Sequence, residues 1–303
     1  MKEAMREQLD FQVFLDKEVN KVKGIYYPVK AGFLRRVLIR KALCRKLHPN
    51  PDDEFCFPEI GPNYQIISGY EKDYRIIKRN ASRKHTMTGG IAEPIMVEKV
   101  HPDGYMILNG HHRWAAALHT GIRSLSVRIV DLTQEKDIRE MLQAGSFDRR
   151  AALDLDEVVF CSADDPYTEK ALPFPLNRIY RERIRLGVPA LFHTLHNNGC
   201  DIWVYTSQYY SLGYLRYYFK HYRVPVTGIV TGTARKTPRG SDTMKELNRM
   251  LDTKYSSTIH IDRNMILCTS GDSHEFEEYR LSGSSETWSR EVIGILEKRK
   301  QHE

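Results

Sequence analysis

Two carboxylates separated by one residue, Asp154 and Asp156, follow the short apolar stretch 151–153. In an extended strand, residues two apart point to the same side of the backbone. Two carboxylates held this close repel each other unless a metal ion or a shared proton lies between them. A carboxylate pair that binds Mg²⁺ is suited to phosphoryl transfer, whereas the simpler alternative is two acids in a turn after a strand.

Three later segments carry polar residues where an element begins or ends. Residues 201–207 form an apolar stretch that ends in hydroxyl side chains, and residues 258–262 form another that ends in Asp262. Between them, Lys236 precedes a predicted helix that continues through Leu251. The apolar stretches are typical of buried strands, so we expect each polar side chain at the end of an element.

In this order, Asp-x-Asp, Thr, Lys and Asp resemble the haloacid dehalogenase-like phosphohydrolases over roughly residues 150–299. The resemblance implies a Rossmann-like parallel sheet that gathers these groups at the carboxyl ends of its strands. It also implies phosphoryl transfer or hydrolysis of a phosphate ester, with Mg²⁺ as cofactor. The substrate would be a phosphorylated small molecule or a nucleotide.

The resemblance assigns a role to each matching residue. Asp154 would be the nucleophile that accepts the phosphoryl group, and Asp156 would protonate the leaving oxygen and then activate water. Thr206 would donate a hydrogen bond to a phosphoryl oxygen. Lys236 would neutralise charge, with Lys245 as the alternative. These roles rest on positioning and on electrostatic stabilisation of a transition state rich in negative charge.

For the metal, the resemblance implies Asp154 and Asp262 as ligands, together with the backbone carbonyl of Asp156. Two positions depart from the family pattern. Glu157 adds bulk and negative charge where a small glycine is usual, and Arg263 stands where a second acid often follows.

A further acid lies nearby in the sequence. Asp272 would supply the missing carboxylate of the metal site. Because of the two departures, the alternative of a degenerate domain that only binds stays open.

The segment 161–181 separates the Asp154 strand from the next predicted helix, at 183–196. In the dehalogenase-like family a cap domain is often inserted here, and this segment is too short for a large one. We therefore expect little or no cap. The site would be open, or closed by the first domain or by another chain, which favours a bulky substrate such as a nucleotide or a phosphoprotein.

Composition indicates an ordinary globular protein of 303 residues, long enough for two domains. No apolar run approaches the roughly 18 residues of a membrane span, and the start lacks the apolar core of a signal peptide. The five cysteines are scattered, without a Cys-x-x-Cys pair. This pattern favours reduced thiols in the cytoplasm and argues against a zinc site.

The net charge of +7 comes from the first fifty residues, which hold 12 Lys/Arg and 5 Asp/Glu. Within them, residues 31–41 alternate apolar pairs with basic pairs at helical spacing. One interpretation is a helix docked by Leu34, Val37 and Leu38 with a solvated basic face. The other is a patch that binds nucleic acid or another anionic partner.

The first half has a different motif. Residues 104–108 predict a strand, Asn109-Gly110 a sharp turn and residues 114–118 a helix, with His111, His112 and Arg113 at the helix start. Backbone donors, the helix dipole and cationic side chains would meet there, which predicts a phosphate site. The alternative is that the two histidines only cap a core helix.

Residues 56–132, with Gly-His-His-Arg at 110–113, resemble the ParB/sulfiredoxin-like fold. Sulfiredoxins carry a reactive cysteine where His111 stands, and ParB-type partition proteins usually carry Glu-Arg-Arg and bind nucleotide and DNA. The free serine kinases of this fold carry a similar Gly-His-His-Arg. That resemblance implies ATP or ADP as ligand and an upstream glutamate as base, for which Glu71 is the candidate and Glu93 the competitor.

The sequence thus predicts the α/β class, with a small mixed α+β domain followed by a parallel-sheet domain. The expected boundaries are a basic helical segment at 1–50, the ParB-like domain at 51–135, a linker at 136–150 and the dehalogenase-like domain at 151–299. We expect an Mg²⁺-dependent enzyme acting through an aspartyl-phosphate at Asp154, with nucleotide binding and a possible kinase activity in the first domain. The alternative is a nucleotide-gated, nucleic-acid-binding ParB-like protein with a vestigial second domain.

Overall fold

A computed structural model describes residues 2–32, 39–82, 93–162, 164–233, 238–270 and 276–301. The chain forms two compact units. The first comprises residues 1–131 with 235–240, and the second comprises residues 132–234 and 241–303. Both units combine helices with a sheet, which confirms the predicted α/β class.

The first unit is built on a mixed sheet of six short strands. Its order is β2-β6-β4-β5-β3, and β1 pairs with the end of β4. The pairs β4–β6 and β3–β5 are parallel, and the others are antiparallel. The strands are β1 (Tyr27–Pro28), β2 (Arg40–Leu43), β3 (Leu47–His48), β4 (Ile95–His101), β5 (Tyr105–Asn109) and β6 (Ser124–Val130).

The described residues of the first unit also form three α-helices: α1 (Lys2–Val22), α3 (Tyr64–Ser82) and α4 (His111–His119). One 3₁₀ turn, η1 (Cys44–Lys46), connects β2 to β3, and another, η2 (Glu54–Cys56), lies between β3 and α3. The core centres on Trp114 of α4, which is 1% exposed and donates its indole N–H to the Cys44 carbonyl at 3.2 Å.

The first fifty residues are part of this unit rather than a separate basic segment. Phe11 and Leu15 of α1 belong to the same buried cluster as Trp114. Residues 33–38 of the predicted basic helix, including Leu34, Val37 and Leu38, lie outside the described residues. Arg40 and Lys41, predicted in that helix, instead form strand β2, because their backbone pairs with β6.

The second unit contains a six-stranded sheet of order β11-β10-β7-β12-β13-β14. The strands from β11 to β12 pair in parallel, and β13 pairs antiparallel with both β12 and β14. The central strands β7 and β10 are almost wholly buried because helices cover both of their faces. The strands are β7 (Arg149–Asp154), β10 (Cys200–Thr206), β11 (Gly228–Thr231), β12 (Ser257–Ile261), β13 (Met265–Ser270) and β14 (Phe276–Arg280).

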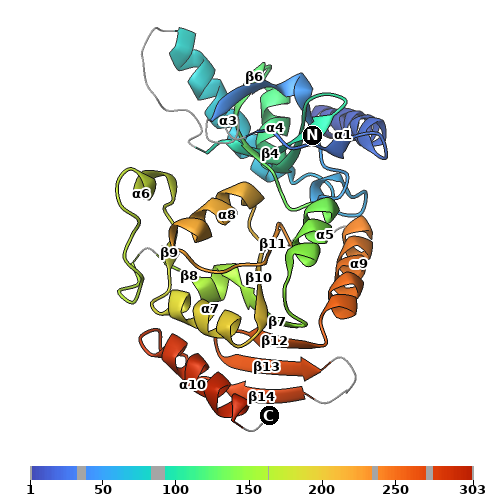
Figure 1. The fold of residues 1–303 in the computed structure, drawn as a ribbon. Coiled ribbons are helices and arrows are strands. Elements are labelled where there is room, and N and C mark those ends of the chain that lie inside the picture. The colour runs from blue at the N-terminus through green and yellow to red at the C-terminus, as the bar shows by residue number, and fades with distance from the viewer. Residues whose placement is uncertain are drawn as a thin grey trace. The chain divides into compact units, whose positions relative to one another are not determined.

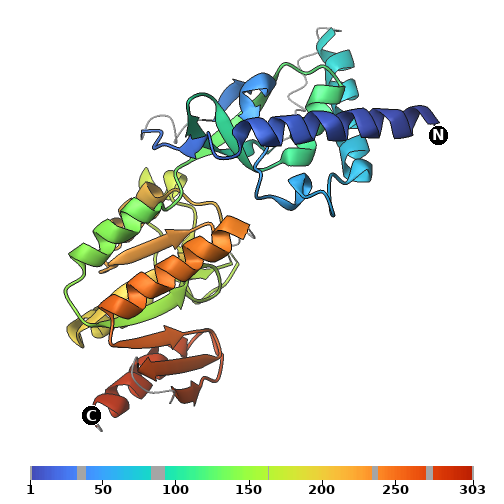
Figure 2. The same ribbon diagram turned by 90° about the vertical axis from the view of Figure 1, so that its right-hand side faces the viewer.

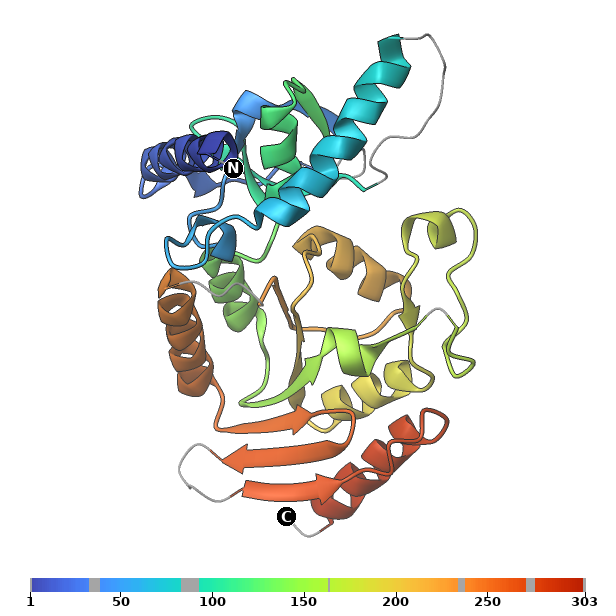
Figure 3. The same cartoon turned by 180° about the vertical axis from the view of Figure 1, so that it is seen from behind.

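Helices α5 (Glu135–Ala144) and α9 (Pro238–Lys254) lie over one face of this sheet (Figures 1 and 2). On the other face, α7 (Val188–Asn197) packs on β10 and against α10 (Trp288–Lys300), as Figure 3 shows. Helix α8 (Leu212–His221) packs beside β11. Residues 136–150, predicted as a linker, contain most of α5, a short connection at 145–148 and the first two residues of β7.

A short hairpin follows β7. The chain makes one π-helical turn, η3 (Leu155–Val159), and then enters β8 (Phe160–Cys161), which pairs antiparallel with β9 (Arg183–Ile184). The predicted helix at 183–196 therefore begins later, after β9. Between β8 and β9, the described residues contain one four-residue helix, α6 (Leu176–Ile179).

Within the described part of the chain, no helix combines the length and the apolar composition that a membrane crossing requires.

Candidate functional site

The predicted polar residues of the second unit gather at one edge of the parallel sheet. Asp154 ends β7 and is paired in register with Tyr205 of β10, while Leu153 is paired with Ile261 of β12. Neighbouring strands lie about 4.8 Å apart. Thr206 and Asp262, the next residues of these strands, therefore flank the Asp154 position as predicted.

Asp154 both ends the strand and closes the turn that follows. Its Oδ1 atom accepts hydrogen bonds from the backbone N–H groups of Asp156 (2.7 Å) and Glu157 (2.8 Å). Leu155 and Val158 of the turn are completely buried. The apolar anchors and the carboxylate cap together fix the Asp154 side chain at the sheet edge.

Asp156 faces the loop that follows β10. Its Oδ1 accepts from the Thr206 hydroxyl at 2.8 Å, and its Oδ2 accepts from both the N–H and the hydroxyl of Ser207, each at 2.9 Å. The Thr206 side chain is fully buried, and its oxygen accepts from the Gln208 N–H at 3.0 Å. The Thr206 hydroxyl thus serves Asp156 in this structure, and its contact with a phosphoryl oxygen stays a prediction.

A buried arginine donates hydrogen bonds to two carbonyls of the π-helical turn η3. Arg185, 4% exposed, donates from Nε to the Val158 carbonyl (2.8 Å) and from Nη2 to the Glu157 carbonyl (3.0 Å). Its guanidinium also lies 5.5 Å from the ring centroid of Trp288. The Glu157 side chain is exposed, so its bulk, a departure from the family pattern, is accommodated in solvent.

Asp154 and Asp262 are the carboxylates that were predicted to bind Mg²⁺ at this edge. Asp262 is exposed, and its Oδ1 accepts from the Arg263 N–H at 2.6 Å. No group of three His, Cys, Asp or Glu side chains among the described residues is arranged to hold a metal. Mg²⁺ is commonly held by one or two carboxylates and keeps several waters, so this donor pair suits it.

The remaining predicted residues of this site lie outside what the structure describes. Lys236 and Asp272 fall in undescribed segments, and the side chain of Lys245 is likewise undescribed although its backbone belongs to α9. The choice between the two lysines therefore stays open.

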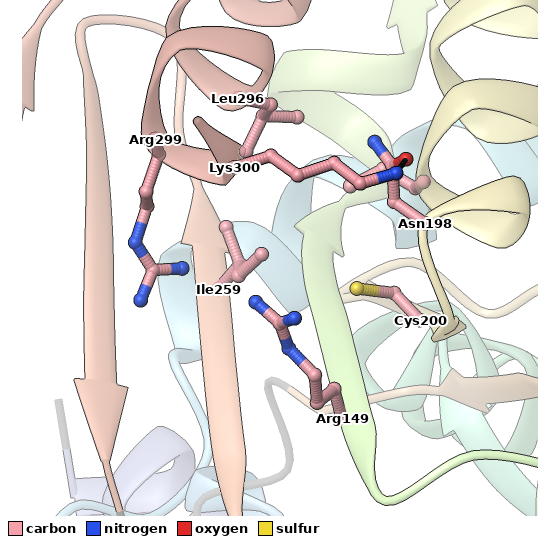
Figure 4. Close-up of a pocket in the computed structure, with 8 residues that line it drawn as sticks. Arg149, Asn198, Cys200, Ile259, Leu296, Arg299 and Lys300 are labelled. Carbon is pink, nitrogen blue, oxygen red and sulfur yellow. Dashed lines mark hydrogen bonds between the residues drawn. The ribbon is translucent and has the colours of Figure 1, made fainter. Parts of the chain in front are cut away.

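A small cavity lies at the other end of the same strands (Figure 4). Arg149, Cys200, Arg299 and Lys300 are among its lining residues, and its volume is about 40 Å³. Arg149 begins β7 and Asp154 ends it, so the two lie about 16 Å apart along the strand. This cavity is too small for a substrate and is separate from the carboxylate edge.

In the first unit, the predicted motif forms a sharp connection between β5 and α4. Gly110 has a φ of +106°, and a Cβ there would lie 3.0 Å from Cγ1 of Ile95 and 3.1 Å from Nη2 of Arg113. A side chain there is strained by the backbone conformation and is accommodated only if these neighbours shift by a few tenths of an ångström. The turn therefore favours glycine and brings the start of α4 close to β4.

Both histidines of the motif accept hydrogen bonds from backbone N–H groups. His111 Nε2 accepts from Asn50 at 3.2 Å, and His112 Nε2 accepts from Asn63 at 3.1 Å. Burial lowers the pKa of His111 to about 4 and also lowers the pKa of His112. Without a bound anion, both rings are therefore neutral near pH 7, with the proton on Nδ1.

Arg113 is also engaged inside the unit. Its side chain is 7% exposed, and Nη1 donates to the Glu93 carbonyl. The guanidinium ties the entrance of β4 to the first turn of α4. A phosphate could contact it only if this bond opened or if another N–H of the fork reached outward.

Glu71, predicted as a base beside the motif, lies elsewhere. Its carboxylate accepts from Nδ1 of His119 (2.7 Å) and from Nη2 of Arg75 (3.3 Å). His119 is eight residues beyond His111, about 12 Å along α4. The structure therefore does not bring Glu71 to the motif, because sequence distance does not fix how α3 lies along α4, and its role as a base stays a prediction. Glu93, the competitor, contacts Arg113 through its backbone carbonyl.

Two helix N-termini meet at the motif. Asn63 stands just before α3, where its side chain accepts from the N–H groups of Gln65 (3.0 Å) and Ile66 (3.2 Å). The backbone N–H of the same residue reaches His112 in the first turn of α4. Helix N-termini carry partial positive charge and favour an anion, whereas the Asp53 carboxylate, 3.5 Å from Nδ1 of His111, adds negative charge at the same end of the unit.

A larger cavity of about 560 Å³ also lies within the first unit, between α1, the β4–β5 pair and the loop before η2. Asn50, whose N–H holds His111, is among its lining residues. Its lining includes the acids Asp16, Asp52 and Glu98 against the single base Lys23. The cavity wall is thus more acidic than the helix start and does not favour phosphate.

Comparison with known proteins is informative for the first unit. Residues 72–145 match the family model of the ParB N-terminal domain. No curated protein matches the sequence. A solved structure of the C-terminally truncated chromosome-partitioning protein ParB from Caulobacter crescentus, complexed with CTP-gamma-S, is 23% identical, with a TM-score of 0.24.

That similarity covers 37% of this chain and 56% of the ParB chain, so this protein spans about half of the ParB structure that it matches. The family match ends at residue 145, before Asp154, and the resemblance of the second unit to the dehalogenase-like family stays a prediction. Most of α3, the Gly110 turn, α4 and α5 lie within the residues that match the ParB N-terminal domain.

Proposed function

We propose that the first unit binds the phosphates of a nucleotide at the start of α4. The observation that carries this proposal is the Gly110 turn, which has a positive φ, leaves little space for a Cβ and leads directly into the helix. Backbone N–H groups at a helix start are good donors to phosphate oxygens. The match of this segment to the ParB N-terminal domain supports the same function.

The groups that would contact the phosphates differ from the side chains that the motif suggests. His111 and His112 would act by fixing the loops that precede η2 and α3, because their Nε2 atoms already accept backbone hydrogen bonds. The backbone N–H groups of the first turn would contact the phosphates. Arg113 would stabilise the turn through its bond to the Glu93 carbonyl and would add positive charge near the phosphates without contacting them.

Isothermal titration calorimetry of the whole chain with ATP, ADP and CTP, with and without Mg²⁺, tests this proposal. A dissociation constant in the micromolar range for one of them would support it. Heat that is equal for wild type and for Gly110→Ala, at temperatures where both remain folded, would remove the assignment to this turn. If the unit also transfers phosphate to a small molecule, Glu93→Gln is the variant that should stop transfer without weakening binding.

A second function is favoured by a specific observation in the second unit. We propose Mg²⁺-dependent phosphoryl transfer at Asp154, because three donors from Thr206 and Ser207 hold Asp156 at the same sheet edge. Oδ1 of Asp154 holds the turn, which leaves Oδ2 as the oxygen that would attack phosphorus.

The proposed steps use this chain's own groups. Oδ2 of Asp154 would form a bond to phosphorus as the ester oxygen leaves, and that oxygen would take a proton from Asp156. Asp156 would then accept a proton from a water that attacks the aspartyl-phosphate and releases inorganic phosphate. The Thr206 and Ser207 hydroxyls can rotate from donating to accepting, so the loop accommodates both protonation states of Asp156.

The metal would be held by the Asp154 and Asp262 carboxylates with the Asp156 backbone carbonyl. When bound, Mg²⁺ supplies neutralisation of the charge on the phosphoryl oxygens. A screen of phosphate monoesters with Mg²⁺ or EDTA tests this function. Asp154→Asn should lose several orders of magnitude in turnover while keeping its fold. Full turnover in that variant would show that Asp154 is not the nucleophile.

The comparisons favour the nucleotide-binding function, because they reach the first unit and stop before Asp154. A nucleotide-gated, nucleic-acid-binding protein with a vestigial second unit therefore stays the competing proposal. The two are separated by the monoester screen: a vestigial unit would release no phosphate from any ester.

A further inference from the structure

Four tyrosines spaced four residues apart follow the Asp156-binding loop: Tyr210, Tyr214, Tyr218 and Tyr222. This spacing places successive side chains along one side of α8. The hydroxyl groups of the last three form hydrogen bonds with the segment between β8 and β9. Tyr218 donates to the Glu182 carbonyl (2.9 Å), Tyr222 donates to the Lys170 carbonyl (3.1 Å), and Tyr214 donates to the Ile179 carbonyl (3.2 Å).

The Tyr214 hydroxyl also donates to the Glu182 carboxylate. The segment 170–182, which includes α6, is thus fixed to α8 by several hydrogen bonds, although it is short and has little regular structure. α6 and α8 can be located in Figure 1. The segment 170–182 is therefore held in place against α8.

Tyr210 and Tyr214, the first two of these tyrosines, lie close to the sheet edge that carries Asp154 and Asp156. Tyr210 lies three residues after Ser207, which holds Asp156, and its ring centroid is 6.1 Å from that of Phe160, four residues after Asp156. Tyr210 and Tyr214 are stacked, with centroids 6.0 Å apart and planes inclined by 11°. Both rings are half-buried. Burial, with Glu182 and then Asp156 as further causes, raises the pKa of Tyr210, so its hydroxyl stays protonated.

Exposed aromatic and basic groups belong to the same two segments, 170–182 and α8. Phe174 is 70% exposed, and the Arg178 guanidinium lies 5.1 Å from its ring centroid. Tyr217 of α8 is 49% exposed. Aromatic faces interleaved with arginines are typical of surfaces on which nucleobases stack while the cations contact phosphates.

We propose that this α6–α8 face, consisting of Phe174, Arg178, Tyr210, Tyr214 and Tyr217, binds the base of a nucleotide whose phosphate ester enters the Asp154 edge. The inference rests on the second proposed function and names its substrate class. Flat rings match a planar base, and Arg178 complements a nucleotide's negative charge. The nucleotide is either a free mononucleotide or the terminal nucleotide of a single strand.

The first experiment compares kcat/KM of the whole chain for matched esters with Mg²⁺ present. Ribose 5-phosphate lacks a base, adenosine 5′-monophosphate carries one, and pentanucleotides with a terminal 5′- or 3′-phosphate carry several. We expect the base-bearing esters to be preferred at least about fivefold, the lower range for one stacked base. A larger preference for the pentanucleotides identifies a strand end as the source, and a preference for the monophosphate identifies a free nucleotide.

Phe174→Ala should lower the preference for base-bearing esters over ribose 5-phosphate by at least about threefold. The matched control is Phe276→Ala, because Phe276 is a similarly exposed phenylalanine (64%) on β14 of the same unit. It should leave the preference as in wild type. Equal kcat/KM for ribose 5-phosphate and adenosine monophosphate, or a Phe174→Ala variant with the full preference, would overturn the inference while the phosphohydrolase proposal stands.

A second readout does not depend on turnover. Photo-crosslinking of the whole chain with 8-azidoadenosine monophosphate, followed by peptide mapping, should label residues 170–183 or 209–222. Labelling there without hydrolysis of any ester would support the α6–α8 face and defeat the phosphoryl-transfer proposal. Labelling confined to peptides of residues 1–131 would overturn the inference, since the nucleotide would then be held by the first unit only.

Discussion

Asp156 and Ser207 are joined by two hydrogen bonds to one oxygen: both the N–H and the hydroxyl of Ser207 donate to Asp156 Oδ2, each at 2.9 Å. Thr206 serves the other oxygen of the same carboxylate. The loop after β10 therefore positions an acid that belongs to the turn after β7. The two parallel strands are coupled through a side chain at the very edge where the chemistry is proposed.

The first prediction concerns the buried hydroxyl in this link. Thr206→Val keeps the shape but removes the donor to Asp156, so the variant should lose about 1–3 kcal/mol in free energy of unfolding. Thr206→Ser keeps the hydroxyl and should lose less. Urea unfolding followed by tryptophan fluorescence measures the difference. Equal stability of the valine and serine variants would mean that the hydroxyl contributes nothing.

Arg185 gives a second prediction. Its planar fork reaches two carbonyls of the π-helical turn at once, which a lysine cannot reproduce. Arg185→Lys should therefore cost about 2–4 kcal/mol in stability and lower phosphate release from the preferred ester.

Arg280→Lys is the control for Arg185, because the Arg280 side chain is 90% exposed and its ion pair with Glu278 lies on the surface. That variant should remain within about 0.5 kcal/mol of wild type. If both variants unfold at the same urea concentration as wild type, the fork does not hold the turn.

Much of the second unit follows from its sequence. The apolar stretches that end in Asp154, Thr206 and Asp262 predicted strands, and their pairing confirms that these strands are neighbours in a parallel sheet. The antiparallel pair β13–β14 was not predicted. Ser207 was visible as a hydroxyl at a strand end, but its partner depends on how the following loop bends, which composition does not reveal.

The first unit shows a different limit. The partners of His111 and His112 lie 61 and 49 residues away in the chain, so the motif alone could not reveal that both rings accept backbone N–H groups. Glu71 was misplaced for a related reason. A residue can be assigned to a helix from sequence, but its position along a neighbouring helix depends on packing. The tyrosine spacing in α8 was visible in the sequence and was overlooked.

The third prediction isolates the packing of Gly110 from its backbone conformation. Gly110→Ala places a Cβ within about 3 Å of Ile95 and Arg113, and Gly24→Ala is the control because Gly24 also has a positive φ (+77°) but open space around it. Both alanines adopt an unfavourable conformation, at a cost of about 1–2 kcal/mol. Gly110→Ala should cost more and should also weaken nucleotide binding. Thermal unfolding and calorimetry that do not distinguish the two variants would contradict the tight fit.

The last prediction is a pH dependence that originates at His111. Burial lowers the pKa of its imidazole to about 4 in the folded protein, against an ordinary value of 6.5. Between these values the unfolded chain binds the proton more readily than the folded one, so stability falls as the pH falls. The contribution is complete above about pH 6.5 and is lost progressively toward pH 4, with a size on the order of 1–3 kcal/mol. His111→Gln keeps an acceptor for the Asn50 N–H but does not titrate, so urea unfolding at a series of pH values should show a shallower decline for the variant than for wild type. Parallel declines from pH 7 to pH 4.5 would mean that His111 takes up its proton without strain and that its ring is not held neutral by the fold.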